Sequence, residues 1–169
     1  VHSANQMGFE VHGGACLNIT NTESLIAYEN MGLKSAELSF ELTKNQIKEI
    51  GGSIERGIIA AGYLPLMLIR ACPNLNSSTK CSACTGSTKM QDRLGENFIL
   101  KCDGNCTEVL NSVYLTLCND IDIFCGIDFY TLRFSVENSV EKVENIRSFS
   151  SKNHNFSKIT RGLYLRGVK

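Results

Sequence analysis

Apolar and polar positions alternate in short blocks along the first part of the chain. Residues 11–19 form an apolar run, and the amphipathic segment that follows has Thr22 as a helix cap and Gly32 as its stop. Residues 35–39 predict a short strand, because apolar and polar side chains alternate there over a few positions. This stretch therefore predicts a strand, a helix and a second strand in succession.

A second helix and a third apolar run continue this rhythm. Thr43 is the expected cap of the helix, with Gln46 in the capping-box position. Residues 60–69 are mostly apolar, and the presence of Gly62 and Pro65 among them favours a buried strand over a helix. Strands and helices that alternate at this spacing predict parallel pairing with right-handed crossovers, so the expected fold class is α/β.

The pattern changes between residues 72 and 117 and then resumes. A turn at residues 93–96 separates two runs that can pair as a hairpin, and residues 108–117 alternate as a further strand. A short helix near Asp120, a strand at residues 129–136 and a last helix follow. Ser139 is the expected cap of this helix, and its apolar face carries Val140, Val143 and Ile146. We expect one domain with three segments, at residues 1–71, 72–117 and 118–169.

Composition limits the class of protein. The chain has 169 residues, 43% of them hydrophobic, and its 17 basic and 17 acidic residues cancel, which argues against a strongly basic nucleic-acid arm. No run reaches the roughly 18 apolar residues of a membrane span, and the start has no signal-peptide pattern. We expect a cytoplasmic protein without membrane contact. Because the chain begins with valine, at what looks like the end of a helix, we expect a piece of a longer protein.

Eight cysteines are the most informative residues. Four Asn-x-Ser/Thr triplets together with an even cysteine count are compatible with a secreted disulfide protein, but the missing signal peptide argues against that class. Cys16, Cys118 and Cys125 lie beside apolar residues, and we expect them to be buried free thiols. The other five cysteines gather in one window: Cys72, Cys81, Cys84, Cys102 and Cys106.

The spacing of these five cysteines indicates a metal. Cys81 and Cys84 form a Cys-x-x-Cys pair, which directs two thiolates at one ion, and Cys102 and Cys106 form a second close pair. Spacing alone favours a four-cysteine zinc site, with an iron-sulfur cluster or disulfides as alternatives. Zinc leaves Cys72 without a role, although it stands at the end of a predicted core strand, where barrels and doubly wound sheets place functional groups.

Six stretches carry a resemblance to a known family. The stretches "GACLNITNTESLIAYENMGLKSAELSFEL", "GYLPLMLIRACP", "CSAC", "DRLGENF", "CTEVLNSVYLTL" and "TRGLYLRGV" occur in this order. Together they resemble the later part of the collagenase-like peptidases, peptidase family thirty-two of unknown catalytic type. The resemblance implies the C-terminal part of a TIM-type barrel with a cysteine-rich β-hairpin insertion. Leu163 and Phe40 depart from the family, where histidine and proline are usual.

The resemblance also implies a cofactor and a chemistry. Relatives of the family add hydroxyl groups to ribosomal or transfer RNA bases, and others act in oxygen-independent ubiquinone hydroxylation with a four-iron cluster held by four cysteines. It therefore implies a 4Fe-4S cluster on Cys72, Cys81, Cys84 and Cys106, with Cys102 as the alternative fourth ligand. We expect an iron-sulfur enzyme of RNA-base hydroxylation or a related hydroxyl transfer, with tRNA or rRNA as the partner.

Polar residues near the ends of apolar runs are the candidate site, because a TIM-type barrel gathers its site at the carboxyl ends of its strands. Glu41 and Arg70 are the catalytic candidates. The candidates for substrate binding are Asn18, Arg93, Asn111 and Arg133. The alternative is a peptidase that acts on peptides and has a structural zinc site, but none of the three histidines belongs to a His-Glu-x-x-His or Gly-x-Ser-x-Gly motif.

Overall fold

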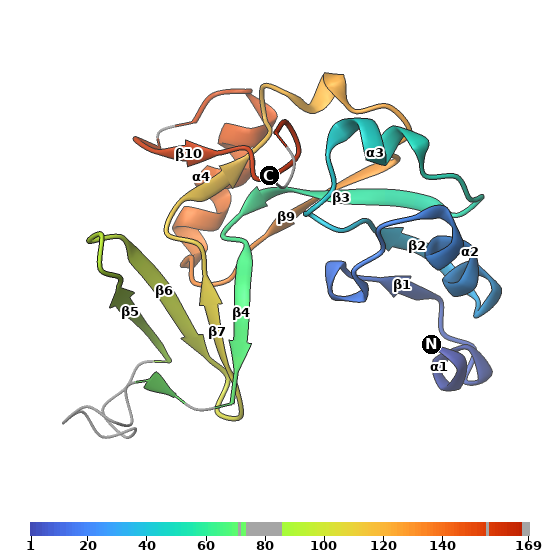
Figure 1. Cartoon of the computed structure of the whole chain (residues 1–169), viewed down its shortest axis with the longest axis horizontal. Helices are drawn as coiled ribbons and strands as arrows, with labels where there is room; N and C mark the ends of the chain where they lie inside the picture. Colours follow the sequence, from blue (N-terminus) through green and yellow to red (C-terminus); the bar gives the residue numbers. More distant parts are fainter. Residues whose placement is uncertain (71, 74–85, 155, 167–169) are drawn as a thin grey trace. The chain divides into compact units, whose positions relative to one another are not determined.

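The computed structural model describes residues 1–70, 72–73, 86–154 and 156–166 (Figure 1). The chain divides into two compact units, each built from separate stretches of sequence. Unit 1 comprises Val1–Ala61, Thr116–Leu132 and Arg161–Lys169, and unit 2 comprises Gly62–Leu115 and Arg133–Thr160. In the described part of the chain, no helix has the length and apolar character to cross a membrane.

Unit 1 is built on a parallel sheet. Its strands β1 (Val11–Gly13), β2 (Leu33–Glu37) and β3 (Glu55–Gly62) lie in the order β1-β2-β3, with Gly13 opposite Ala36 and Ala36 opposite Arg56. β9 (Phe129–Arg133) also pairs with β3. The described helical elements of unit 1 are α1 (His2–Gln6), η1 (Ala15–Leu17), α2 (Thr22–Asn30), α3 (Lys44–Glu49) and η4 (Ile121–Ile123). The parallel sheet with its helices confirms the expected α/β class, and the barrel that the resemblance implies stays a prediction.

The helix caps of unit 1 follow from which side-chain oxygens are available. Asn21 caps α2, because its Oδ1 accepts a hydrogen bond from the Ser24 N–H at 2.8 Å. Thr22, the cap expected from the sequence, is instead the first helical residue, and its hydroxyl accepts a hydrogen bond from the Gly51 N–H at 2.9 Å. The capping box expected for α3 from Thr43 and Gln46 is confirmed. Leu25 of α2 and Ile47 of α3 are fully buried in the core.

Unit 2 contains an antiparallel sheet of four strands, in the order β4-β7-β6-β5. The strands are β4 (Pro65–Ile69), β5 (Ser87–Gln91), β6 (Asn97–Cys102) and β7 (Thr107–Leu110). The expected hairpin is confirmed as β5 and β6. Asp92 Oδ1 holds its turn by accepting hydrogen bonds from the N–H groups of Leu94 at 2.8 Å and Glu96 at 2.9 Å.

The apolar run at residues 60–69 is not one buried strand, as the sequence suggested. It is divided between β3 and β4, because Gly62 adopts φ +130°, a conformation that side chains disfavour. A Cβ atom at Gly62 would lie 2.2 Å from the Arg133 carbonyl oxygen. β4 is an outer strand of its sheet, and its consecutive residues Leu66, Met67 and Leu68 are 54%, 58% and 70% exposed, so neither face of the strand is buried there.

The remaining elements of unit 2 are β10 (Ile159–Thr160) and α4 (Ser139–Ser150), together with most of β8 (Tyr114–Thr116). β8 and β10 pair in parallel, with Ile159 opposite Tyr114. Asn138, rather than the expected Ser139, caps α4: its Oδ1 accepts hydrogen bonds from the Val140 and Glu141 N–H groups, and Glu141 completes a capping box.

Tyr164 anchors the core of unit 1. It is fully buried, its hydroxyl donates a hydrogen bond to the Ile59 carbonyl at 3.1 Å, and its ring packs edge-to-face against Phe124 at 5.5 Å. Burial, and secondly the charge of Glu37, raise the pKa of the Tyr164 phenol well above its ordinary value. The folded phenol therefore keeps its proton at a pH where the unfolded phenol has released it.

Tyr164→Phe tests this anchor. At pH 7 the variant should be less stable by about 1 kcal/mol, since the Ile59 carbonyl loses a donor. A raised pKa gives stability that is complete below about pH 10 and is lost as the pH rises above it, so the stability of the variant should fall less steeply there. Urea unfolding on both sides of that pH measures the two slopes. Equal slopes for the two proteins would contradict the burial of an un-ionised phenol.

Candidate functional site

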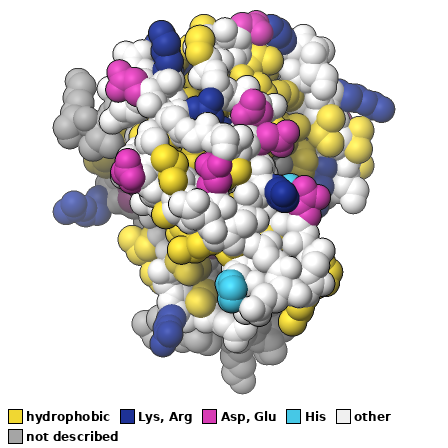
Figure 2. Space-filling model, turned by 90° about the vertical axis from the view of Figure 1, so that its right-hand side faces the viewer, with side chains coloured by type: hydrophobic (Ala, Val, Ile, Leu, Met, Phe, Trp, Pro, Cys, Tyr) yellow, Lys and Arg dark blue, Asp and Glu magenta, His cyan; other side chains and the backbone are white. Residues whose placement is uncertain are grey.

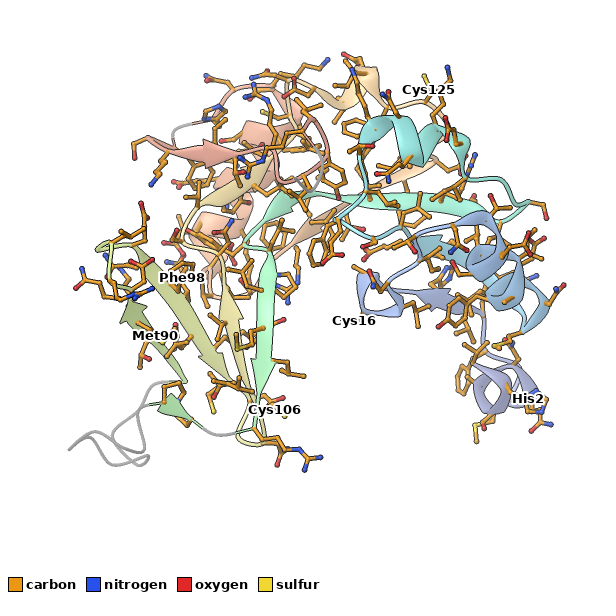
Figure 3. The ribbon with its side chains drawn as sticks, in the orientation of Figure 1. His2, Cys16, Met90, Phe98, Cys106 and Cys125 are labelled. Atoms are coloured by element: carbon orange, nitrogen blue, oxygen red, sulfur yellow. The ribbon has the colours of Figure 1, made fainter. Side chains whose placement is uncertain are left out.

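Three described cysteines lie, in sequence, at or next to strand ends that the four-stranded sheet pairs with one another. Cys102, the last residue of β6, pairs with Thr107, the first residue of β7, and Thr107 pairs with Ile69, the last residue of β4. Cys72 follows Ile69 by three residues, and Cys106 directly precedes Thr107. Figure 3 shows Cys106 where β7 begins and β4 ends. We call this end of the sheet the cysteine end.

A tight turn joins the two strands at the cysteine end. Asp103 Oδ1 accepts hydrogen bonds from the N–H groups of Asn105 at 2.9 Å and Cys106 at 2.7 Å. These bonds, the one from Cys106 first, lower the pKa of the Asp103 carboxyl. The Gly104 N–H donates to Cys102 Sγ at 3.4 Å, which is the kind of contact that stabilises a metal-bound thiolate. The Gly104 N–H is therefore one donor in this turn that suits a thiolate-bound metal or cluster.

Two of the proposed ligands, Cys81 and Cys84, lie outside the described residues. Gly86 is the first described residue after them, and its carbonyl accepts a hydrogen bond from the Cys102 N–H at 2.7 Å. The described chain therefore resumes at the cysteine end. Within the described ranges, no three His, Cys, Asp or Glu side chains are grouped closely enough to hold a metal ion.

The cysteines outside the cluster differ from one another. Cys118 is buried, as expected, whereas Cys16 and Cys125 are exposed, contrary to expectation. Cys16 lies in the short η1 turn after β1, and Cys125 lies in the loop after η4 (Figure 3). An apolar neighbour in the sequence does not bury a cysteine when the backbone turns at that position.

The candidate arginines of unit 2 have different surroundings. Arg70 and Arg93 are exposed, with Arg70 directly after β4 and Arg93 in the hairpin turn. Arg133 is engaged, because its guanidinium donates to Glu108 Oε1 at 2.6 Å and to the Tyr63 carbonyl at 3.0 Å. Asn111 is half-buried, and its N–H donates to the Leu64 carbonyl at 2.9 Å.

Two candidates in unit 1 meet at one hydroxyl. Ser39 Oγ donates to Asn18 Oδ1 at 2.6 Å and accepts a hydrogen bond from the Glu41 N–H at 3.3 Å. Asn18 adopts a left-handed conformation with φ +49° at the end of η1, while Glu41 is exposed. Ser39 therefore brings the backbone of Glu41 and the amide of Asn18 to the same place beyond the end of β2.

Sequence reasoning missed a polar group on the parallel sheet. Glu37, the last residue of β2, accepts a hydrogen bond from the Ala15 N–H at 2.8 Å and another from the Thr131 hydroxyl. On the same strand, Ser35 Oγ lies 2.7 Å from His12 Nδ1. His12 and Ser35 line a hollow of about 400 Å³. Ser35 and Glu37 are two residues apart in a strand and so share a face, which is the signal that could have found them.

Charges of both signs are interspersed on the face of the molecule that Figure 2 shows. This agrees with the zero net charge of the chain. On this face, a contact with RNA would depend on individual side chains more than on a broad positive field.

Comparisons with known proteins give no match. No protein-family model, no curated protein and no solved structure matches the chain significantly. The assignment of a function therefore rests on the described residues and on the resemblance of the six sequence stretches.

Glu37→Ala tests the polar group on the parallel sheet. The substitution leaves the Ala15 N–H and the Thr131 hydroxyl without their acceptor, so the free energy of unfolding should fall by about 1–3 kcal/mol. Glu41→Ala is the matched control, because Glu41 is exposed, and its effect should stay within about 0.5 kcal/mol. Urea unfolding of both variants makes the comparison, and equal effects would show that Glu37 does not hold this part of unit 1 together.

Proposed function

We propose that the cysteine end of unit 2 holds an iron-sulfur cluster and that the chain belongs to an iron-sulfur enzyme. The observation that carries the proposal is the register of the sheet, which brings Cys102, Thr107 and Ile69 into line. Cys72 and Cys106 are close in sequence to two of these paired positions. Gly86, two residues after Cys84, accepts a hydrogen bond from the N–H of Cys102, the third paired position.

The proposed ligands are Cys72, Cys81, Cys84 and Cys106, with Cys102 as the alternative to Cys106. Two features support Cys106. It stands outside the paired strands, and its N–H is fixed by Asp103 Oδ1. The hydrogen bond from the Gly104 N–H to the Cys102 sulfur supports Cys102 as the fourth ligand. The strand pairing argues against it: Cys102 lies opposite Thr107, so its side chain must point to the face of the sheet that Thr107 occupies.

A bound cluster would supply electron-transfer chemistry, and the chain would supply binding and orientation. Arg70 lies between β4 and Cys72 and is exposed, so its guanidinium is free to make a two-point contact with a phosphate. Arg93 is exposed in the same unit. These cations and the resemblance support RNA as the substrate class and hydroxylation of its bases as the reaction. Glu41 and Arg70 remain the candidates for catalytic residues.

The alternative is a peptidase of the same family whose cysteines hold a structural zinc ion. A four-cysteine zinc site would use both close pairs, so it would require Cys102 and Cys106 together and leave Cys72 free. The two proposals therefore differ in metal, in sulfide content and in the role of Cys72. None of the six described cysteines forms a disulfide, which suits either site and the reducing cytoplasm that we propose for the protein.

Anaerobic purification followed by metal, sulfide and absorption measurements tests the proposal. The protein should contain iron and acid-labile sulfide and should absorb visible light. Cys72→Ala and Cys106→Ala should each lose most of this iron and sulfide, because each removes one ligand of four. Cys125→Ala is the control, because it removes an exposed cysteine of unit 1 that is not a proposed ligand. Its iron and sulfide contents should equal those of the unmodified protein.

The contrary result is equally specific. A colourless protein with zinc, no sulfide and an unaffected metal content in Cys72→Ala would rule out the cluster in favour of the zinc site. Loss of iron in Cys102→Ala, with iron retained in Cys106→Ala, would keep the cluster but reverse the choice of the fourth ligand.

A further inference from the structure

Unit 2 contains a cavity of about 290 Å³ with an aromatic wall. Tyr63 and Tyr114 meet edge-to-face with their ring centroids 5.2 Å apart, and Phe156 stacks on Tyr114 at 4.1 Å. All three rings line the cavity. Its volume is close to the lower limit of about 300 Å³ for ligand pockets in proteins, so it can take only a small molecule.

Three acidic side chains line another part of this cavity, beside Val136, Asn145 and Ser148. Glu141 and Glu144 of α4 and Glu137 just before the helix all face it. The apolar side chains of α4 point elsewhere, since Val140 and Val143 are 66% and 46% exposed. An amphipathic helix normally buries its apolar stripe. Here it presents carboxylates to aromatic rings instead, which creates a cavity with negative charge and apolar walls.

Glu137 is held in place and left incompletely bonded. Its Oε2 atom accepts hydrogen bonds from the Ser135 N–H at 2.6 Å and the Val136 N–H at 3.0 Å. Its Oε1 atom is buried and has no hydrogen-bond partner among the described residues. A buried carboxylate oxygen without a donor is costly, so this atom indicates a missing partner.

The electrostatics of the cavity agree with this view. Burial first, and then the charges of Glu137 and Glu141, raise the pKa of the Tyr63 phenol. Burial and the charge of Glu137 also raise the pKa of Tyr114. No lysine or arginine is among the described residues that line the cavity, so its negative charge is not neutralised there.

We propose that this cavity binds a small organic cation, an alkylammonium or quaternary ammonium group of about the size of choline. The carboxylate of Glu137 would meet the positive charge, and the rings of Tyr63 and Tyr114 would add cation–π attraction while they contact its alkyl groups. A divalent metal ion suits the cavity less well, because such an ion needs six or more oxygen ligands and aromatic rings supply none. No cysteine is among the described lining residues, so this site is separate from the proposed cluster.

Calorimetric titration of the whole chain with choline, at constant ionic strength, tests the proposal. Choline should bind at one site, about tenfold or more tightly than its neutral isostere 3,3-dimethylbutan-1-ol, because only the cation gains the cation–π contact and the attraction to Glu137. The absence of saturable binding, or equal binding of the two compounds, would overturn the proposal.

Matched variants assign the binding to this cavity. Glu137→Gln keeps the side-chain size and an acceptor for Ser135 but removes the charge, so choline affinity should fall about tenfold while that of the neutral isostere stays unchanged. Glu49→Gln removes the same charge from an exposed position of α3 and should bind as the unmodified protein does. Equal affinity in Glu137→Gln would refute the site.

A second pair of variants covers the case in which Glu137→Gln fails to fold. Tyr63→Phe retains the aromatic face and should change choline affinity by less than about threefold, whereas Tyr63→Leu should lower it by about tenfold. Circular dichroism checks that each variant is folded. Equal choline affinity in folded Tyr63→Leu and Tyr63→Phe would also refute the proposal.

Discussion

The hydrogen-bond register of the four-stranded sheet is the constraint on which the cysteine end depends. Cys102, Thr107 and Ile69 lie in one row across β6, β7 and β4, and the Asp92 turn fixes the pairing of β5 with β6. A slip of one residue between β6 and β7 would move the Cys102 side chain to the opposite face of the sheet. Backbone pairing therefore sets where Cys102 lies relative to Thr107 and Ile69.

In the described part of the chain, carboxylates held by main-chain N–H groups occur at the polar group on the parallel sheet, at the cysteine end and at the aromatic cavity. Glu37 accepts from Ala15, Asp103 from Asn105 and Cys106, and Glu137 from Ser135 and Val136. Backbone donors cost no side-chain entropy, so they fix a carboxylate firmly. The environment then decides what the carboxylate does. The second carboxylate oxygen of Glu37 accepts a hydrogen bond from Thr131, so both of its oxygens are bonded within the fold. Glu137, in contrast, has a buried oxygen without a partner among the described residues.

Local signals in the sequence predicted local structure in part. The capping box of α3 and the β5–β6 hairpin were predictable, because each depends on residues close in sequence, and the succession of strand-like and helix-like blocks indicated the α/β class. The caps of α2 and α4 were each expected one residue too late. Signals that depend on tertiary context misled. The apolar run at residues 60–69 appeared continuous in the sequence, yet Gly62 divides it. The apolar residues of α4, such as Val140, lie on one face of the helix as expected, but the fold leaves that face exposed. The cavity was out of reach, since Tyr63, Tyr114 and Glu137 are far apart in sequence.

X-ray absorption at the iron edge, on protein purified without oxygen, tests the central claim most directly. It reports which atoms surround the metal, independently of colour or activity. An iron-sulfur cluster on the cysteine end predicts sulfur neighbours around iron and a second shell of iron, because the irons of a cluster share sulfides. Both features should be missing from Cys106→Ala. A protein without iron, and with zinc surrounded only by sulfur, would contradict the account.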